Sequence, residues 1–241
     1  MNGTIAEQPF VLSPPSAPVE RHGRVDLHLP AGDGSHPAVV LVHGAPLPPG
    51  TADPRDWLLY QGYGALLAEQ GLVAAALSYQ VTDLAELPAT ADDIAALVEL
   101  VRADPRVDAE RVVLWFFSGG SLLAADWLRA APPWLRGIAL TYPLLVPLPG
   151  GEVDPRFLPV GALDGGGTTP VVLTRAGRDK IPQVLTGIAD FLDAAARTGR
   201  AVRVVDVPDG QHAFDILDHT AQSREAVQTA RDAVVDLLRA T

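Results

Sequence analysis

The chain passes from an apolar run into a serine and two glycines at Arg111-Val112-Val113-Leu114-Trp115-Phe116-Phe117-Ser118-Gly119-Gly120-Ser121-Leu122-Leu123. A short, valine-rich apolar run is typical of a strand buried on both faces of a parallel sheet. The apolar residues that follow, from Ala124 to Leu128, indicate a helix. We therefore predict a buried strand, a tight turn at Ser118 and a helix directly after it.

Five further runs have the same buried-strand character, and apolar stripes at helical spacing separate several of them. The runs are Ala38–Val42, Val73–Ser78, Ile138–Thr141, Val171–Thr174 and Val202–Val207, and the stripes cover Ile94–Val101, Val184–Ala195 and Val227–Leu237. Strands that alternate with helices of this length predict an α/β fold with a doubly wound, mostly parallel sheet.

Three segments depart from this alternation. Residues 1–18 contain Pro14-Pro15 and predict an N-terminal arm, and Val19–Leu29 alternates like an edge strand with one solvated face. Residues 142–169 are irregular and predict a small lid over the active face. We expect residues 1–241 to form a single domain.

Composition narrows the classes of function. The net charge is −11, which argues against nucleic-acid and anionic-membrane partners. There is no cysteine, which removes disulfides, thiolate nucleophiles and Cys-ligated metals. No signal-like leader or membrane-length apolar stretch is visible, so we expect a cytoplasmic protein, while its oligomeric state stays open.

Ser118 is the predicted nucleophile, since an activated serine needs a sharp strand-to-helix turn that lifts its hydroxyl clear of the sheet. A serine that only caps a helix would give a similar local pattern. Ser121 is a weaker candidate, because it lies inside the helix and lacks a following small residue. Phe116 departs from the small residue usual two places before such a serine, and a ring there requires compensating space.

A second turn follows the first buried strand at His43-Gly44-Ala45-Pro46. Such a turn can aim the Ala45 N–H at the serine, where it and the Gly119 N–H would hold an oxyanion. A plain Gly/Pro connection is the alternative interpretation. His43 is expected to be structural, because it precedes the serine and sits at the strand end.

An acid and a base follow in the required order. Asp179 comes after the strand Val171–Thr174, and His212 comes after the strand Val202–Val207. Both fall beyond the carboxyl ends of strands, where a doubly wound sheet places its ligands. Ser118, Asp179 and His212 therefore form the predicted catalytic triad. Asp215 is too close to His212 in the chain to serve as its acid, and Asp154 and Asp164 remain weak alternatives.

Four motifs follow one another along the chain. They are the His-Gly turn, the Phe116-Phe117-Ser118-Gly119-Gly120 elbow, Ala176-Gly177-Arg178-Asp179 and Gly210-Gln211-His212-Ala213-Phe214-Asp215. Together they resemble the dienelactone hydrolase-like branch of the α/β-hydrolases. The resemblance runs from about residue 19 to the C-terminus. It implies about eight strands, no cofactor, and hydrolysis of an ester, lactone or related acyl bond. Dienelactone hydrolases proper use a cysteine nucleophile, and this chain offers a serine in that place.

The leading hypothesis is a serine hydrolase that acts on a small-molecule acyl substrate through an acyl-enzyme. A biosynthetic acyltransferase or cyclase with the same triad is the alternative, and a catalytically silent binding module is a more distant one. Trp57, Phe117 and Tyr142 are candidate substrate-binding residues, although each fits a core position equally well. No metal site is expected.

Overall fold

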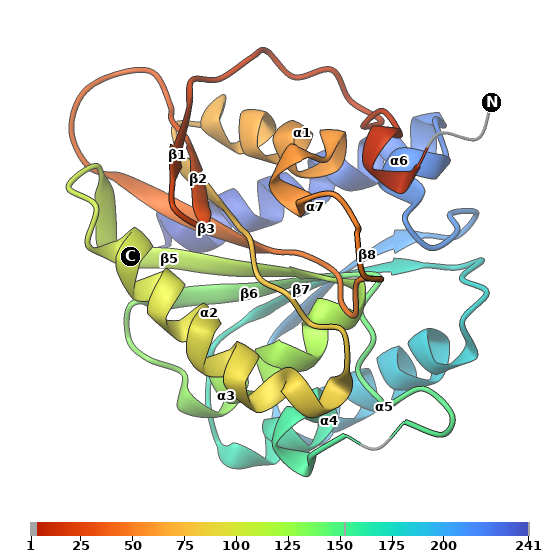
Figure 1. Ribbon diagram of the computed structural model, residues 1–241. Coiled ribbons are helices and arrows are strands. Elements are labelled where there is room, and N and C mark those ends of the chain that lie inside the picture. The colour runs from red at the N-terminus through yellow and green to blue at the C-terminus, as the bar shows by residue number, and fades with distance from the viewer. Residues whose placement is uncertain (1–3, 152, 241) are drawn as a thin grey trace.

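The computed structural model describes residues 4–151 and 153–240. Their centre is an eight-stranded sheet in the order β1-β2-β4-β3-β5-β6-β7-β8 (Figure 1). The strands are β1 (Val19–His22), β2 (Val25–His28), β3 (His36–Val42), β4 (Val73–Leu77), β5 (Val107–Phe117), β6 (Leu135–Thr141), β7 (Val171–Ala176) and β8 (Val202–Val207). Strands β3 to β8 are parallel, and β1 and β2 pair antiparallel at one edge.

Helices cover both faces of the sheet. They are α1 (Leu58–Ala68), α2 (Leu87–Arg102), α3 (Ala124–Ala130), α4 (Pro159–Ala162), α5 (Pro182–Thr198), α6 (Phe214–Leu217) and α7 (Ala221–Arg239). In Figure 1, α1, α6 and α7 lie above the sheet and α2 to α5 lie below it. Alternate residues of the central strands point into the two layers, so Phe117 packs in the upper core and Phe116 in the lower one. The predicted α/β fold with a doubly wound, mostly parallel sheet is confirmed.

One prediction for the sheet edge was wrong. Residues 19–29 form a hairpin of two short strands rather than one edge strand. Gly23 makes the turn with a φ of +57°, a conformation that glycine adopts without a Cβ clash. Strand β1 is the exposed edge, whereas β2 is buried between β1 and β4.

Two irregular segments pack closely on the helices. In the N-terminal arm, Phe10 and Val11 are buried, and the Phe10 ring lies 4.9 Å from the Tyr63 ring of α1. In the segment 142–169, the short 3-10 turn Pro155–Phe157 leads into α4, and Phe157 is fully buried in the lower core. This part of the segment therefore packs against α3 and α5. A lid over the active face stays a prediction.

Candidate active site

Ser118 directly follows β5 and is the first residue of a 3-10 helix, η4 (Ser118–Leu123), which continues into α3. The φ angle of Ser118 is +49°, in the left-handed region that residues with a Cβ rarely adopt. Such a conformation persists only where the surroundings enforce it, and it is often found at functional sites. The structure thus has the predicted sharp turn at Ser118, with the side chain half-buried at the carboxyl edge of the sheet.

The three residues predicted to work together lie in direct contact. Ser118 Oγ is 2.8 Å from His212 Nε2, and His212 Nδ1 is 2.6 Å from Asp179 Oδ2. The side chain of Asp179 is fully buried, and its second oxygen accepts a hydrogen bond from the Ile181 N–H at 2.9 Å. The His212 side chain is 25% exposed, so one end of this chain of hydrogen bonds is buried and the other can reach solvent. Three separate strand ends, those of β5, β7 and β8, supply these side chains.

The bulky residue Phe116 and the weaker nucleophile candidate Ser121 are both buried. Phe116 is fully buried, and its register partners on the neighbouring strands are Val42 and Leu140. Its ring therefore belongs to the lower core, away from the upper layer where Phe117 packs. Ser121 is also fully buried, and its Oγ has no hydrogen-bond partner among the described residues. Ser121 is inaccessible to a substrate in this conformation.

The His43–Ala45 loop packs against the elbow so closely that only glycines fit between them. A Cβ on Gly119 would lie 1.8 Å from the Ala45 carbonyl oxygen, and a Cβ on Gly120 would lie 2.1 Å from the His43 carbonyl oxygen. A Cβ on Gly44 would lie 3.3 Å from the Ser118 Cβ. The two glycines after the serine are therefore required by the approach of this loop.

Both predicted oxyanion donors lie at this contact. The Ala45 nitrogen is 3.6 Å from where a Gly119 Cβ would stand, and the Ala45 N–H makes no hydrogen bond to any residue that the structure describes. The Gly119 N–H is in the first turn of η4, where helical N–H groups lack intrahelical acceptors. The two amides are thus near each other and next to Ser118. Their role in holding an oxyanion stays a prediction.

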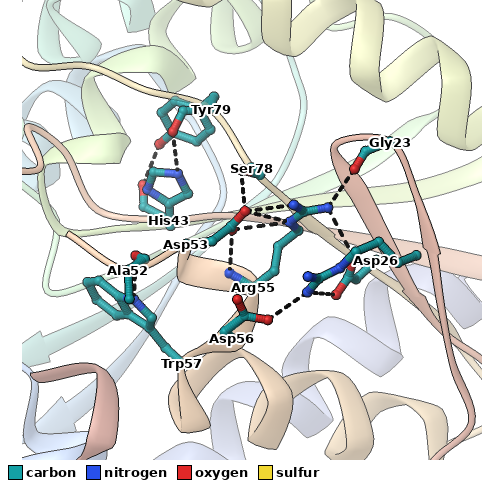
Figure 2. Close-up of polar contacts among 11 residues, drawn as sticks. Gly23, Asp26, His43, Ala52, Asp53, Arg55, Asp56, Trp57, Ser78 and Tyr79 are labelled. Atoms are coloured by element: carbon teal, nitrogen blue, oxygen red, sulfur yellow. Dashed lines mark hydrogen bonds and ion pairs between the residues drawn. The ribbon is translucent and has the colours of Figure 1, made fainter. Parts of the chain in front are cut away.

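His43 fixes the start of this loop. Its ring stacks on Tyr79 with centroids 3.8 Å apart, and its Nδ1 and Nε2 face the carbonyl oxygens of Gly44 and Tyr79 at 2.8 and 3.1 Å. Figure 2 shows this pair of residues beside the loop. Burial lowers the pKa of His43 to about 4, so the ring is neutral at pH 7. These contacts fit the structural role expected for His43.

An ion-pair network fixes the other end of the loop. Arg55 is buried and donates to Asp53 Oδ2 at 2.6 Å, to the Gly23 carbonyl at 2.7 Å and to Asp26 Oδ1 at 3.2 Å (Figure 2). Burial raises the pKa of Asp53, but the hydrogen bonds from Arg55 and Ser78 outweigh it and bring the pKa to about 2. The loop that carries Ala45 is therefore held at residue 43 and again at residues 53–55.

The three aromatic residues predicted to bind substrate are all buried. Trp57 is 6% exposed and donates its Nε1–H to the Ala52 carbonyl, and Phe117 is 1% exposed between Tyr60 and Tyr63. Tyr142 is 2% exposed, and its ring lies 4.7 Å from the His212 ring. All three belong to the upper core, and contact with a substrate stays a prediction for each.

A buried polar group that the sequence pattern did not indicate lies behind the triad. Asp215 is fully buried and accepts hydrogen bonds from the hydroxyls of Tyr63 and Tyr142. Its place three residues after His212, within the motif Gly210–Asp215, was the only sequence signal. The tyrosines come from distant parts of the chain, so the pattern around His212 could not indicate them.

The described residues include neither a metal-binding cluster nor a membrane-spanning helix. Within residues 4–151 and 153–240, no group of three or more His, Asp or Glu side chains is arranged to hold a metal ion. No helix in the same part of the chain has the length and apolar character needed to cross a membrane.

Comparisons with known proteins agree with this fold. Residues 25–127, from β2 to the middle of α3, match the family model described as BD-FAE. No curated protein sequence matches the chain.

Solved structures match over nearly the whole chain. Esterase 2 of Thermogutta terrifontis phosphorylated by paraoxon has a TM-score of 0.70 at 18% identity, covering 95% of this chain and 98% of that one. EstE1, a thermophilic carboxylesterase cloned from a metagenomic library, has a TM-score of 0.78 at 16% identity, covering 95% and 92%. DphMB1 has a TM-score of 0.74 at 20% identity, covering 93% and 86%. The chain is thus an α/β-hydrolase by fold, and its structural neighbours include carboxylesterases.

Proposed function

We propose that this protein is a serine hydrolase that cleaves a carboxylic ester through an acyl-enzyme. The observation that carries the proposal is the continuous hydrogen-bonded chain from Ser118 Oγ through His212 to Asp179, at 2.8 and 2.6 Å. A serine that only caps a helix is not expected to contact a histidine whose other ring nitrogen is hydrogen-bonded to a buried carboxylate. The carboxylesterases among the structural neighbours support the same class of reaction.

In the proposed reaction, His212 takes the Ser118 proton as Oγ attacks the ester carbonyl carbon. The N–H groups of Ala45 and Gly119 hold the resulting oxyanion, and Asp179 stabilises the imidazolium. His212 then gives its proton to the leaving alkoxide, which departs as the alcohol and leaves the acyl group on Ser118. Water, deprotonated by His212, attacks this acyl-enzyme, and His212 returns the proton to Ser118 Oγ as the acid is released.

The substrate proposed is a small acyl ester or lactone, and short acyl chains are the first to assay. Structures of Thermogutta terrifontis esterase 2 with bound butyrate and propionate support this choice. Hydrolysis of propionate and butyrate esters, compared with lactones of similar size, separates the two bond types. The proposal also keeps a cytoplasmic location and a small-molecule partner rather than a nucleic acid or a membrane.

A fluorophosphonate probe tests the nucleophile, since the paraoxon adduct of the Thermogutta enzyme shows that an enzyme of this fold reacts with organophosphorus reagents. Peptide mapping should find the label on Ser118. Ser118→Ala should abolish labelling and lower kcat by about 10⁶-fold. Ser121→Ala is the matched control, because that buried serine lies three residues away, and it should label like the wild type. A label on another residue, or one that survives Ser118→Ala, contradicts the assignment.

A further inference from the structure

A second buried carboxyl group lies behind the histidine of the site. Asp215 is fully buried at the start of α6, and Asp179 already occupies the Nδ1 side of His212. The Asp215 carboxylate instead accepts from Tyr63 Oη at 3.0 Å and from Tyr142 Oη at 3.1 Å. The proposed reaction leaves this acid and its two tyrosines without a function.

Tyr142 connects Asp215 to His212. Its hydroxyl donates to the Asp215 carboxylate, while its ring lies 4.7 Å from the His212 ring at an interplanar angle of 53°. Tyr142 also has a φ of +36°, which is unfavourable for a residue with a bulky side chain. A backbone conformation of this kind needs support from its surroundings. The hydrogen bond to Asp215 supplies that support from the side-chain end.

The loop that carries His212 is also fixed through α6. Ala213 has a φ of +58°, so the chain turns sharply between His212 and the helix. The Val11 N–H donates to the Asp215 carbonyl oxygen at 2.9 Å, and the Gln211 N–H donates to Asp218 Oδ2 at 2.8 Å. Asp215 is therefore held by its backbone to the N-terminal arm and by its side chain to α1 and to the loop after β6.

The charge of Asp215 also acts on His212. The titratable groups that face its carboxyl group are Tyr60 and Tyr63 of α1, Tyr142 after β6 and His212 before α6. Burial raises the pKa of Asp215 to about 6, against the opposing effect of the tyrosine hydrogen bonds. The carboxyl group is therefore mostly ionised at pH 7 and above. A buried negative charge near an imidazole favours its protonated form.

We propose that Asp215 is a positioning residue, which holds the His212 imidazole through Tyr142 and stabilises the imidazolium that forms when Ser118 loses its proton. The inference rests on the proposed function, since it concerns the proton transfer from Ser118 to His212. It adds a second buried carboxylate to the site, one that acts on the histidine without a direct hydrogen bond to it.

Two matched variants separate positioning from simple stabilisation. Tyr142→Phe and Tyr63→Phe each remove one hydroxyl that donates to Asp215, but only the Tyr142 ring lies against His212. Tyr142→Phe should lower kcat on a short-chain ester by about tenfold, with KM within about twofold of the wild type. Both variants should lower the melting temperature by similar amounts, because each loses one hydrogen bond to Asp215. Tyr63→Phe should lower kcat less than Tyr142→Phe does. Equal losses of kcat in the two variants would overturn the positioning role.

Asp215→Asn tests the charge while nearly preserving the volume of the side chain. The acid limb of the pH profile of kcat/KM should move to lower pH, because the imidazolium loses a stabilising negative charge. The titration of the His212 Cε1–H by NMR, assigned with His212→Asn, should move in the same direction. An unchanged His212 titration midpoint in Asp215→Asn overturns the proposal.

The NMR titration does not need catalysis, so it distinguishes two failures. If the fluorophosphonate probe leaves Ser118 unmodified, the proposed function fails, and the titration still decides whether Asp215 acts on His212. If Ser118 is labelled and the titration midpoint does not move, only the role of Asp215 fails. Should Asp215→Asn not fold, the titration is measured in Tyr142→Phe, where the weakened hold on the carboxylate should still alter the midpoint.

Discussion

At the residue scale, the site depends on two neighbouring positions with opposite demands on the backbone. Ser118 has a side chain in a conformation that favours glycine, with a φ of +49°. Gly119 has an ordinary φ but no room for a side chain, because the Ala45 carbonyl oxygen fills the place of its Cβ. The close approach of the Ala45 loop explains the missing side chain at Gly119, and it brings the Ala45 amide to the elbow.

Gly119→Ala should therefore damage the site more than the fold. The new methyl group must displace the Ala45 loop, and loss of one oxyanion donor typically lowers kcat by about 100- to 1,000-fold. Assays of a butyrate ester give kcat, and urea unfolding gives the change in stability. Gly161→Ala is the control, since a Cβ at Gly161 in α4 meets nothing within 4 Å. Equal activity of the two variants would contradict this account.

At the scale of elements, the loop between β3 and α1 is attached to the sheet edge rather than left free. Its carboxylate Asp53 binds Arg55, and Arg55 binds Asp26 of β2, whose side chain is 5% exposed. The hairpin β1–β2 therefore supports the loop that carries the Ala45 amide. The hairpin contributes no residue to the triad, and its connection to the site runs through Arg55 of this loop.

Arg55→Ala should lower the free energy of unfolding by about 3 kcal/mol, because it leaves buried Asp26 with fewer partners. Arg21 still binds Asp26 in this variant, so the loss should be at the lower end of the roughly 3–5 kcal/mol typical of a broken buried ion pair. Arg24→Ala is the control, since the Arg24–Asp93 pair is exposed and should contribute less than about 1 kcal/mol. Urea unfolding of both variants measures the difference. Similar stabilities would show that the Arg55 network is energetically unimportant.

At the scale of the whole molecule, two buried or half-buried acids make stability depend on pH in opposite directions. The pKa of Asp215 rises from 3.8 to about 6 on folding, so its favourable contribution is complete below pH 3.8 and is lost as the pH rises through 6. The pKa of Asp53 falls to about 2, so its contribution is present above pH 3.8 and is lost as the pH falls through 2. The two pH windows do not overlap.

Asp215→Asn should therefore remove one pH-dependent term from the stability. The free energy of unfolding of the variant minus that of the wild type should increase from pH 4 to pH 6, because only the wild type loses stability there, and it should stay constant above about pH 7. Urea unfolding at half-unit steps of pH measures this difference. A difference that stays flat between pH 4 and 6 would mean that the carboxyl group does not titrate there in the folded protein.

The large features of this molecule follow from local patterns in the chain. Short and mostly apolar runs, several of them valine-rich, predict β3 to β8, since a strand buried on both faces needs apolar residues in continuous order. The positions of Ser118, Asp179 and His212 after three such runs predict that they meet, because the carboxyl ends of parallel strands share one edge of the sheet. Both predictions depend only on neighbours in the chain and on the handedness of strand crossovers.

Other features were decided by contacts between distant segments. The hairpin turn at Gly23 gave no clear signal against a single strand, because Val25 and Leu27 alternate in either case. Phe116 fits because it points into the lower core, which no pattern around the serine could indicate. Asp215 meets Tyr63 and Tyr142 only because α1, α6 and the loop after β6 pack in one layer above the sheet. Sequence alone thus determined the parallel strands β3 to β8 and which residues reach their carboxyl edge. Tertiary packing decided the hairpin at the sheet edge and which buried polar groups meet, since buried polar groups need hydrogen-bond partners.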